Sequence, residues 1–149
     1  MVTLTQLELG VVILGWALFG MVLLLRFRNG GLTAHRDRRS LIGMGLQAAG
    51  LGMVWGIDRS PIPGTLEPIR ASIVILCLVV SLPLAASAVR RLGKQWSLAA
   101  RVLTDHELIT SGPYALVRHP IYTGVLGMLL ATGLAISRWW GLGIGALIY

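Results

Sequence analysis

Residues 106–122 read HELITSGPYALVRHPIY and run directly into an uncharged apolar stretch. Pro120 disfavours helical geometry at the residue before it, His119, and suits the first position of the helix that the apolar stretch predicts. Arg118 and His119 are therefore expected at a helix N-terminus, where unpaired backbone N–H groups and the helix dipole favour anions. Arg118 adds a full positive charge, so this point of the chain should bind an anionic group such as a carboxylate.

Turn-forming and aromatic residues surround this helix start. Gly112 and Pro113 predict a turn before it. Tyr114 and Tyr122 flank it with rings that can pack against a flat ligand and with hydroxyls that can hydrogen-bond. Judged alone, His119 would more often be a helix-capping imidazole, and the tyrosines would be ordinary residues of a membrane interface. The pattern as a whole favours a ligand site.

The run resembles the isoprenylcysteine carboxyl methyltransferase family, integral-membrane enzymes that take a methyl group from S-adenosylmethionine. A looser likeness extends from Leu92, through Trp96 and Ser97, to Tyr149. The resemblance implies an S-adenosylmethionine-dependent methyltransferase of the isoprenylcysteine carboxyl O-methyltransferase type, acting on a lipophilic substrate at the cytoplasmic membrane face. The residues that match in the family's spacing are His106, Leu108, Ile109, Gly112, Tyr114, Val117, Arg118, His119, Pro120 and Tyr122.

The resemblance also implies which residues hold the cofactor. Physical reasoning adds Arg118 to them, as a partner for the carboxylate of the cofactor. Taken by itself, His106 could equally be a solvated loop residue. The family positions that line the S-adenosylmethionine site match His106, Glu107, Leu108, Ile109, Tyr114, His119, Pro120, Ile121 and Tyr122.

No catalytic residue is assigned from the sequence. Methyl transfer from a sulfonium is an in-line displacement that needs no metal, so the protein has to bind and align the reactants and exclude water. The sequence has no metal-ligand spacing, no Ser-His-Asp set and no paired carboxylates within an apolar span. We therefore expect a cofactor site without a metal ion.

Composition places the chain among polytopic helical membrane proteins. Hydrophobic residues make up 55% and charged residues 13% of the chain, against roughly 25% charged residues in soluble domains. The 149 residues form one domain at most, too small to bury so much apolar surface in a single core. The net charge of +7 does not indicate nucleic-acid binding. The arginines stand in short loops beside apolar spans, where they set orientation and contact lipid headgroups.

The fold is predicted to be all-α, a single membrane domain over residues 1–149. Residues from about 140 to 149 are predicted to form an incomplete fifth span, in a helical hairpin with the fourth. The segment 90–120 is predicted to carry the cofactor motif on the cytoplasmic side. Four full transmembrane helices are expected at about residues 8–26, 40–57, 71–89 and 120–137.

Charge distribution predicts the orientation of the spans. Ten of the thirteen Lys and Arg residues fall in two segments, 26–39 and 90–118. Positively charged loops stay on the cytoplasmic side of a membrane. The N-terminus is therefore predicted to lie outside, and the segment with the cofactor motif to lie in the cytoplasm.

Several residues within or beside the predicted spans have more than one reading. Gly52 and Gly56 form a G-x-x-x-G pattern that suits close helix packing in lipid. Gln47 is the one amide of the second span, and we expect it to hydrogen-bond a neighbouring helix rather than a substrate. Pro83 should kink the third span. Residues 102–109 are compatible with an extended or a short helical segment.

The C-terminal stretch leads to an expectation about the extent of the chain. Residues 141–149 would reach only about 14 Å as a helix, roughly half of the hydrocarbon thickness. In the family, a cytosolic tail with a Glu pair follows the fifth span, and the sequence has no counterpart of it. We therefore expect a C-terminally truncated family member, or a partner chain that completes the missing part.

Two other functions stay open at this stage. Phospholipid N-methyltransferases and small-thiol methyltransferases share the membrane hairpin and a similar motif. A non-catalytic, truncated membrane protein would keep the spans without the activity. For an enzyme, the expected partners are a lipophilic small-molecule substrate and membrane lipids, with no nucleic acid and no metal.

Overall fold

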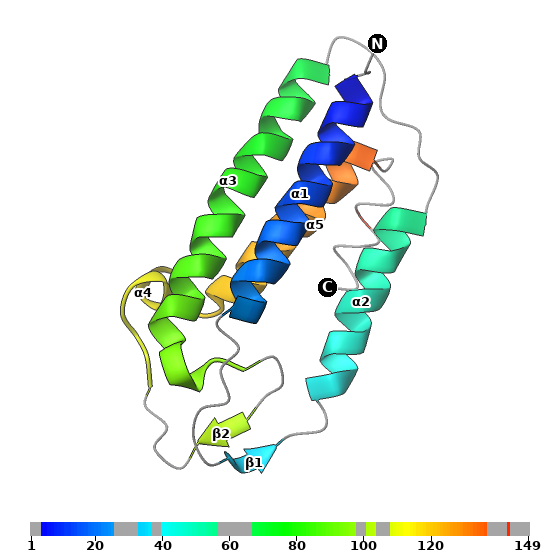
Figure 1. Ribbon diagram of the computed structural model, residues 1–149. Helices are drawn as coiled ribbons and strands as arrows, with labels where there is room; N and C mark the ends of the chain where they lie inside the picture. The colour runs from blue at the N-terminus through cyan, green and yellow to red at the C-terminus, as the bar shows by residue number, and fades with distance from the viewer. Residues whose placement is uncertain are drawn as a thin grey trace.

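The computed structural model describes residues 4–25, 33–36, 40–56, 67–97, 101–103, 108–136 and 143. Figure 1 shows that they form a helical bundle with a small two-stranded sheet at one end. The elements in chain order are α1 (Leu4–Leu25), β1 (Thr33–Arg36), α2 (Ser40–Gly56), α3 (Glu67–Leu92), a 3-10 turn (Gly93–Gln95), β2 (Arg101–Leu103), α4 (Pro113–Leu116) and α5 (Pro120–Ile136).

Helices α1, α3 and α5 make up the centre of the bundle, with α3 packed along α5 and α1 in contact with both. A hydrogen bond between the first turns of α1 and α3, and another between the end of α1 and the segment after α3, show that these two helices run parallel. Helix α5 runs in the opposite direction, and α2 stands to one side and packs mainly on α5 (Figure 1). Direction therefore alternates along α1, α2, α3 and α5.

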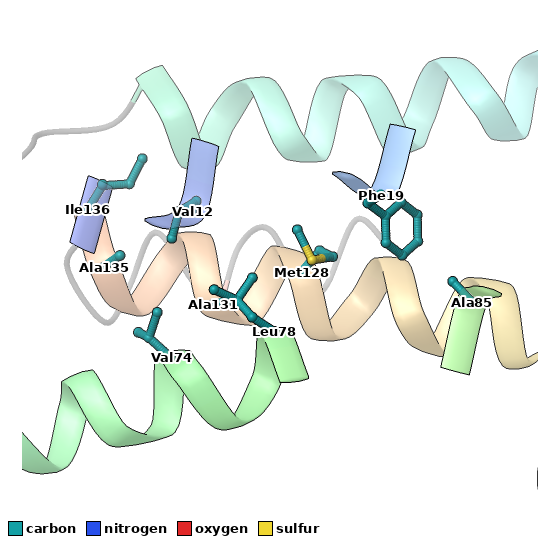
Figure 2. Packing of buried hydrophobic residues seen from close by; sticks show 9 residues of the cluster. All are labelled: Val12, Phe19, Val74, Leu78, Ala85, Met128, Ala131, Ala135 and Ile136. Carbon is teal, nitrogen blue, oxygen red and sulfur yellow. The ribbon is translucent and has the colours of Figure 1, made fainter. Parts of the chain in front are cut away.

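The core lies where apolar side chains of α1, α3 and α5 meet, as Figure 2 shows. Small residues let α3 and α5 approach closely. At Gly124 an added Cβ would lie 3.2 Å from the backbone oxygen of Ser81 and 3.3 Å from Cε2 of Phe19. The core cluster consists of Val12, Phe19, Val74, Leu78, Ala85, Met128, Ala131, Ala135 and Ile136.

Two buried polar contacts connect the central helices. Trp16 donates from Nε1 to Oγ1 of Thr132 at 2.9 Å, and the same hydroxyl donates to the carbonyl oxygen of Met128 at 2.7 Å. At the other contact, Arg70 and Glu8 form an ion pair at 2.8 Å between α3 and α1, and each side chain is only 6% exposed. The first span was expected to begin at Glu8, but the helix begins at Leu4 and encloses this carboxylate.

Among the residues that the structure describes, two helices, not the four that were expected, are long and apolar enough to cross a bilayer by length and composition: Gln6–Leu25 and Glu67–Leu92. Helices α2 and α5 have 17 residues each. At about 1.5 Å per residue they reach roughly 25 Å, which is short of a hydrocarbon layer of about 30 Å. The expected fifth span lies outside the described residues except for Gly143.

The outward faces of the two long helices are apolar as well. Leu14 and Leu25 of α1 and Leu76 and Val79 of α3 are all exposed. A helix that is apolar on every side belongs in a large core or in a membrane. Because the bundle is too small to cover these faces, the arrangement agrees with a membrane protein.

The architecture is helical, as predicted, with one small addition, a two-stranded sheet. Strands β1 and β2 pair antiparallel, with Arg36 opposite Arg101 and a bulge between Thr33 and His35. The strand Arg101–Leu103 overlaps the start of the segment 102–109, for which the sequence allowed an extended or a helical form. The strands belong to the two basic segments 26–39 and 90–118, so these segments meet at one end of the bundle.

Candidate cofactor site

A turn and a single helical turn carry the first half of the motif. Gly112 has φ +65° and ψ −133°, a backbone conformation that L-residues with a Cβ disfavour. Helix α4 follows, with Pro113 at its start and with hydrogen bonds from the Ala115 amide to the Gly112 carbonyl (3.0 Å) and from the Val117 amide to the Pro113 carbonyl (3.1 Å). The turn predicted at Gly112 and Pro113 is confirmed, and it positions Tyr114.

The start of α5 has the geometry that Pro120 predicts. Val117 is extended, with φ −137° and ψ 142°, and α5 begins at Pro120. The carbonyl oxygen of His119 accepts hydrogen bonds from the backbone amide (2.9 Å) and the hydroxyl (3.0 Å) of Thr123. His119 therefore precedes the helix, and its imidazole is exposed beside Tyr122, with the two ring centroids 6.0 Å apart in an edge-to-face arrangement.

The end of α3 holds the motif in place. Arg91, in the last turn of α3, donates from Nε (2.9 Å) and from a terminal guanidinium nitrogen (2.6 Å) to Oγ of Ser111. Ser111 immediately precedes the Gly112 turn. Two hydrogen bonds from one planar guanidinium to one oxygen restrict the direction of the loop as well as its distance from α3.

Trp96 connects the same end of α3 to α1. Its side chain is 8% exposed, and its Nε1 donates to the carbonyl oxygen of Leu23 at 3.0 Å. Leu23 lies in the last turn of α1, where carbonyl oxygens lack intrahelical donors. Trp96 thus supplies a donor to the end of α1 and closes the bundle beneath the motif.

A cavity of about 280 Å³ lies between these elements. Its lining is polar on the side of the motif and apolar where Leu23, Leu92 and Val125 contribute. The predicted cofactor residues that line it are Tyr114, Arg118, His119, Pro120, Ile121 and Tyr122, and the other lining residues are Leu23, Gln47, Leu92, Gln95, Trp96, Ser97 and Val125. One cavity therefore collects most of the predicted site at the start of a helix.

The side chains that line the cavity include a positive charge and no negative one. Arg118 is the charged side chain of the lining, and none of the lining residues is an aspartate or a glutamate. Burial raises the pKa of the Tyr114 hydroxyl to about 12, so this group stays protonated and able to donate a hydrogen bond at neutral pH. The cavity thus offers donors and aromatic faces rather than metal ligands.

A model of the isoprenylcysteine carboxyl methyltransferase family matches residues 73–147. The chain belongs to this family. Membership indicates a membrane methyltransferase, in a family whose members in general use S-adenosylmethionine. The matched region includes α5 and nearly all of α3, together with the motif between them. Neither a curated protein nor a solved structure matches the chain.

The remaining predicted site residues of this family member do not line the cavity or are not described. Leu108 has a side chain that is 86% exposed, and Ile109 is half-buried, and both lie outside the cavity lining. His106 and Glu107 lie outside the described residues. The side chains gathered at the cavity are therefore those that follow the Gly112 turn.

Sequence reasoning missed the other wall of the cavity. Leu23 and Gln47 come from α1 and α2, outside the region that matches the family. Trp96 belongs to the looser family likeness and lines the cavity as well. Gln47 was expected to hydrogen-bond a neighbouring helix, but it makes no hydrogen bond to another described residue and lines the cavity instead. Its one signal in the sequence was its presence as the only amide of an apolar span.

Proposed function

We propose that this chain binds S-adenosylmethionine in the cavity and transfers its methyl group to the carboxyl group of a lipophilic acceptor. One observation carries the proposal: Tyr114 and the motif residues from Arg118 to Tyr122 line one cavity together with apolar side chains such as Leu23, Leu92 and Val125. A polar cofactor and an apolar acceptor need such a mixed site. The family match supports the reaction class.

The donors present suit the cofactor. Arg118 and the first-turn N–H groups of α5 would hold its carboxylate, because both favour an anion. The rings of Tyr114 and Tyr122 would face its adenine or its sulfonium, which aromatic faces attract. When bound, S-adenosylmethionine supplies a methyl group on a positively charged sulfur.

The protein itself has a modest chemical task. A carboxylate acceptor is already deprotonated at neutral pH, so none of the side chains has to remove a proton. Leu23, Leu92 and Val125 exclude water and accommodate an apolar chain. Tyr114, as a protonated hydroxyl, orients a bound acceptor group by donating a hydrogen bond.

The proposal includes a membrane orientation. Helices α2 and α5 would cross the bilayer together with α1 and α3, with the bilayer thinned or the flanking residues extended to make up for their length. The alternating helix directions and the joint position of the two basic segments support this arrangement. The cavity would then open on the cytoplasmic side, with the N-terminus outside.

Calorimetric titration of the purified chain in detergent with S-adenosylmethionine tests the cofactor site. We expect binding that is lost or at least about tenfold weaker in His119→Ala, since one hydrogen bond or ring contact is worth about this much. The substitution keeps the carbonyl oxygen that accepts from Thr123, so it leaves the start of α5 intact. Leu116→Ala, at an exposed residue of α4 that is outside the cavity and outside the predicted cofactor set, is the control. Equal affinity of the His119→Ala variant and the wild type would contradict the proposal.

The acceptor class needs an assay of its own. The chain in lipid nanodiscs is incubated with methyl-labelled S-adenosylmethionine and with a prenylated cysteine, phosphatidylethanolamine or a simple thiol. We expect label in the prenylated cysteine. Label in phosphatidylethanolamine or the thiol would assign a different acceptor to the same cavity, and cofactor binding without any transfer would favour a non-catalytic membrane protein.

A further inference from the structure

Gln47 is the polar side chain that α2 contributes to the cavity. The helix Ser40–Gly56 contains no other amide and no charged residue. Gln47 is half-buried and lines the cavity together with Tyr122 and Arg118 of the motif. Helix α2 packs mainly on α5, at whose start the motif lies. The amide of Gln47 therefore reaches the cavity from a helix that does not carry the motif.

The height of Gln47 along the bundle follows from where the other lining residues lie on their helices. Leu23 lies in the last turn of α1, and Pro120 is the first residue of α5. Gln47 is seven residues beyond Ser40, so α2 extends about 10 Å past it towards the sheet. Gln47 therefore lies at the level where the polar motif enters the bundle, in agreement with its place in the lining of the same cavity.

The amide of Gln47 has no internal role that accounts for it. It makes no hydrogen bond to any other residue that the structure describes. The side chain is half-buried and lines the cavity, so its amide is open to a ligand there. A ligand in the cavity would supply the missing partner.

We propose that Gln47 binds the polar head of the methyl acceptor and so helps to determine which acceptors are used. This inference rests on the proposed function. The amide N–H groups would donate to a carboxylate oxygen, while the apolar tail of the acceptor lies along Leu23 and Val125. A neutral donor stabilises a carboxylate less than a guanidinium does, so the oxygen keeps more of its nucleophilicity. Arg118, which also lines the cavity, remains for the anionic group of the cofactor.

Kinetics and binding of Gln47→Leu in nanodiscs test the assignment. The probes are N-acetyl-S-farnesylcysteine, which has a free carboxylate, and its methyl ester, which lacks the charge. We expect the KM of Gln47→Leu for the acid to rise about tenfold or more, as for loss of a hydrogen bond to a charged group. The affinities for S-adenosylmethionine and for the ester should stay within about twofold of the wild type.

A double variant, Gln47→Ala/Ala48→Gln, is the matched control. It keeps the composition of α2 but moves the amide to an exposed neighbouring position that does not line the cavity. It should show the same loss as Gln47→Leu. An unchanged KM in both variants, or full recovery in the double variant, would overturn the assignment.

Direct binding separates this inference from the proposed function. The acid and the ester are titrated into the wild type and Gln47→Leu with and without S-adenosylmethionine. Preference of the wild type for the acid, lost in Gln47→Leu, supports the assignment even if no methyl group is transferred. Failure of the wild type to bind the acid, or a Gln47→Leu variant that loses affinity for the cofactor instead, would overturn it. A wild type that does not bind S-adenosylmethionine would overturn the proposed function alone.

Discussion

The ion pair between Glu8 and Arg70 should respond in opposite ways to the loss of one charge and to the loss of both. The two side chains are almost completely buried and are joined by one contact of 2.8 Å. Oε1 of Glu8 and Nε and one terminal nitrogen of Arg70 have no hydrogen-bond partner among the described residues. The surrounding described residues therefore do not supply all the hydrogen bonds that the two buried charged groups can make.

Removing one partner leaves a buried charge without compensation. Arg70→Met should lower the free energy of unfolding by about 3–5 kcal/mol. At roughly 2–4 °C per kcal/mol for a chain of this size, the unfolding midpoint should fall by about 6–20 °C. The double variant Glu8→Leu/Arg70→Met removes both charges and should recover most of this loss, or exceed the wild type, because unsatisfied buried pairs are often replaced by apolar residues without cost.

Thermal or detergent-induced unfolding, followed by circular dichroism in one detergent, measures these differences. Arg90→Met removes the same charge from an exposed position near the other end of α3 and should change stability by less than about 0.5 kcal/mol. Glu8→Leu and Arg70→Met are also measured singly. If their effects simply add up in the double variant, Glu8 and Arg70 do not interact. That result, or an Arg70→Met variant as stable as the wild type, would refute the reasoning.

Three further outcomes follow from the described contacts. Gly124→Ala should destabilise the protein by about 1–3 kcal/mol in the same unfolding assay, whereas Gly20→Ala, where a Cβ meets no atom within 4 Å, should stabilise it by up to about 1 kcal/mol. Arg91→Ala, which loses both hydrogen bonds to Ser111, should weaken S-adenosylmethionine binding about tenfold in calorimetry, and unchanged affinity would contradict a positioning role. The pKa of Tyr114 rises from 10.0 to about 12 on folding, so the unfolded chain loses its proton first and stability should fall as the pH rises between these values. Tyr114→Phe should flatten that part of the pH–stability profile, and an unchanged slope would contradict the burial of the hydroxyl.

Local chemistry made the motif readable from the sequence. Pro120 determines where α5 can begin, and Gly112 supplies a backbone conformation that other residues disfavour, so both act over a few residues. The positions of Arg118 and His119 before a helix follow directly from these restrictions. The family resemblance was correct for the same reason, because it depends on this contiguous run.

Contacts between distant parts of the chain were not predictable in this way. Glu8 and Arg70 are 62 residues apart, at the start of the predicted span 8–26 and just before the predicted span 71–89, and their pairing depends on the parallel packing of α1 and α3. The strands are only three and four residues long and lack an alternating pattern, so their pairing depends on the helices that bring them together. Gln47 likewise acquires its neighbours only once α2 lies against α5.

The open space around three glycines of α2 has a consequence for protein engineering. Helices α1, α3 and α5 are interlocked through their side chains, whereas an added Cβ at Gly43, Gly45 or Gly52 of α2 would meet nothing within 4 Å. Substitutions at these three glycines can therefore add bulk without disturbing the three-helix core. Libraries of variants at these glycines and at Gln47, with the motif left untouched, would test whether α2 can alter the choice of acceptor proposed above.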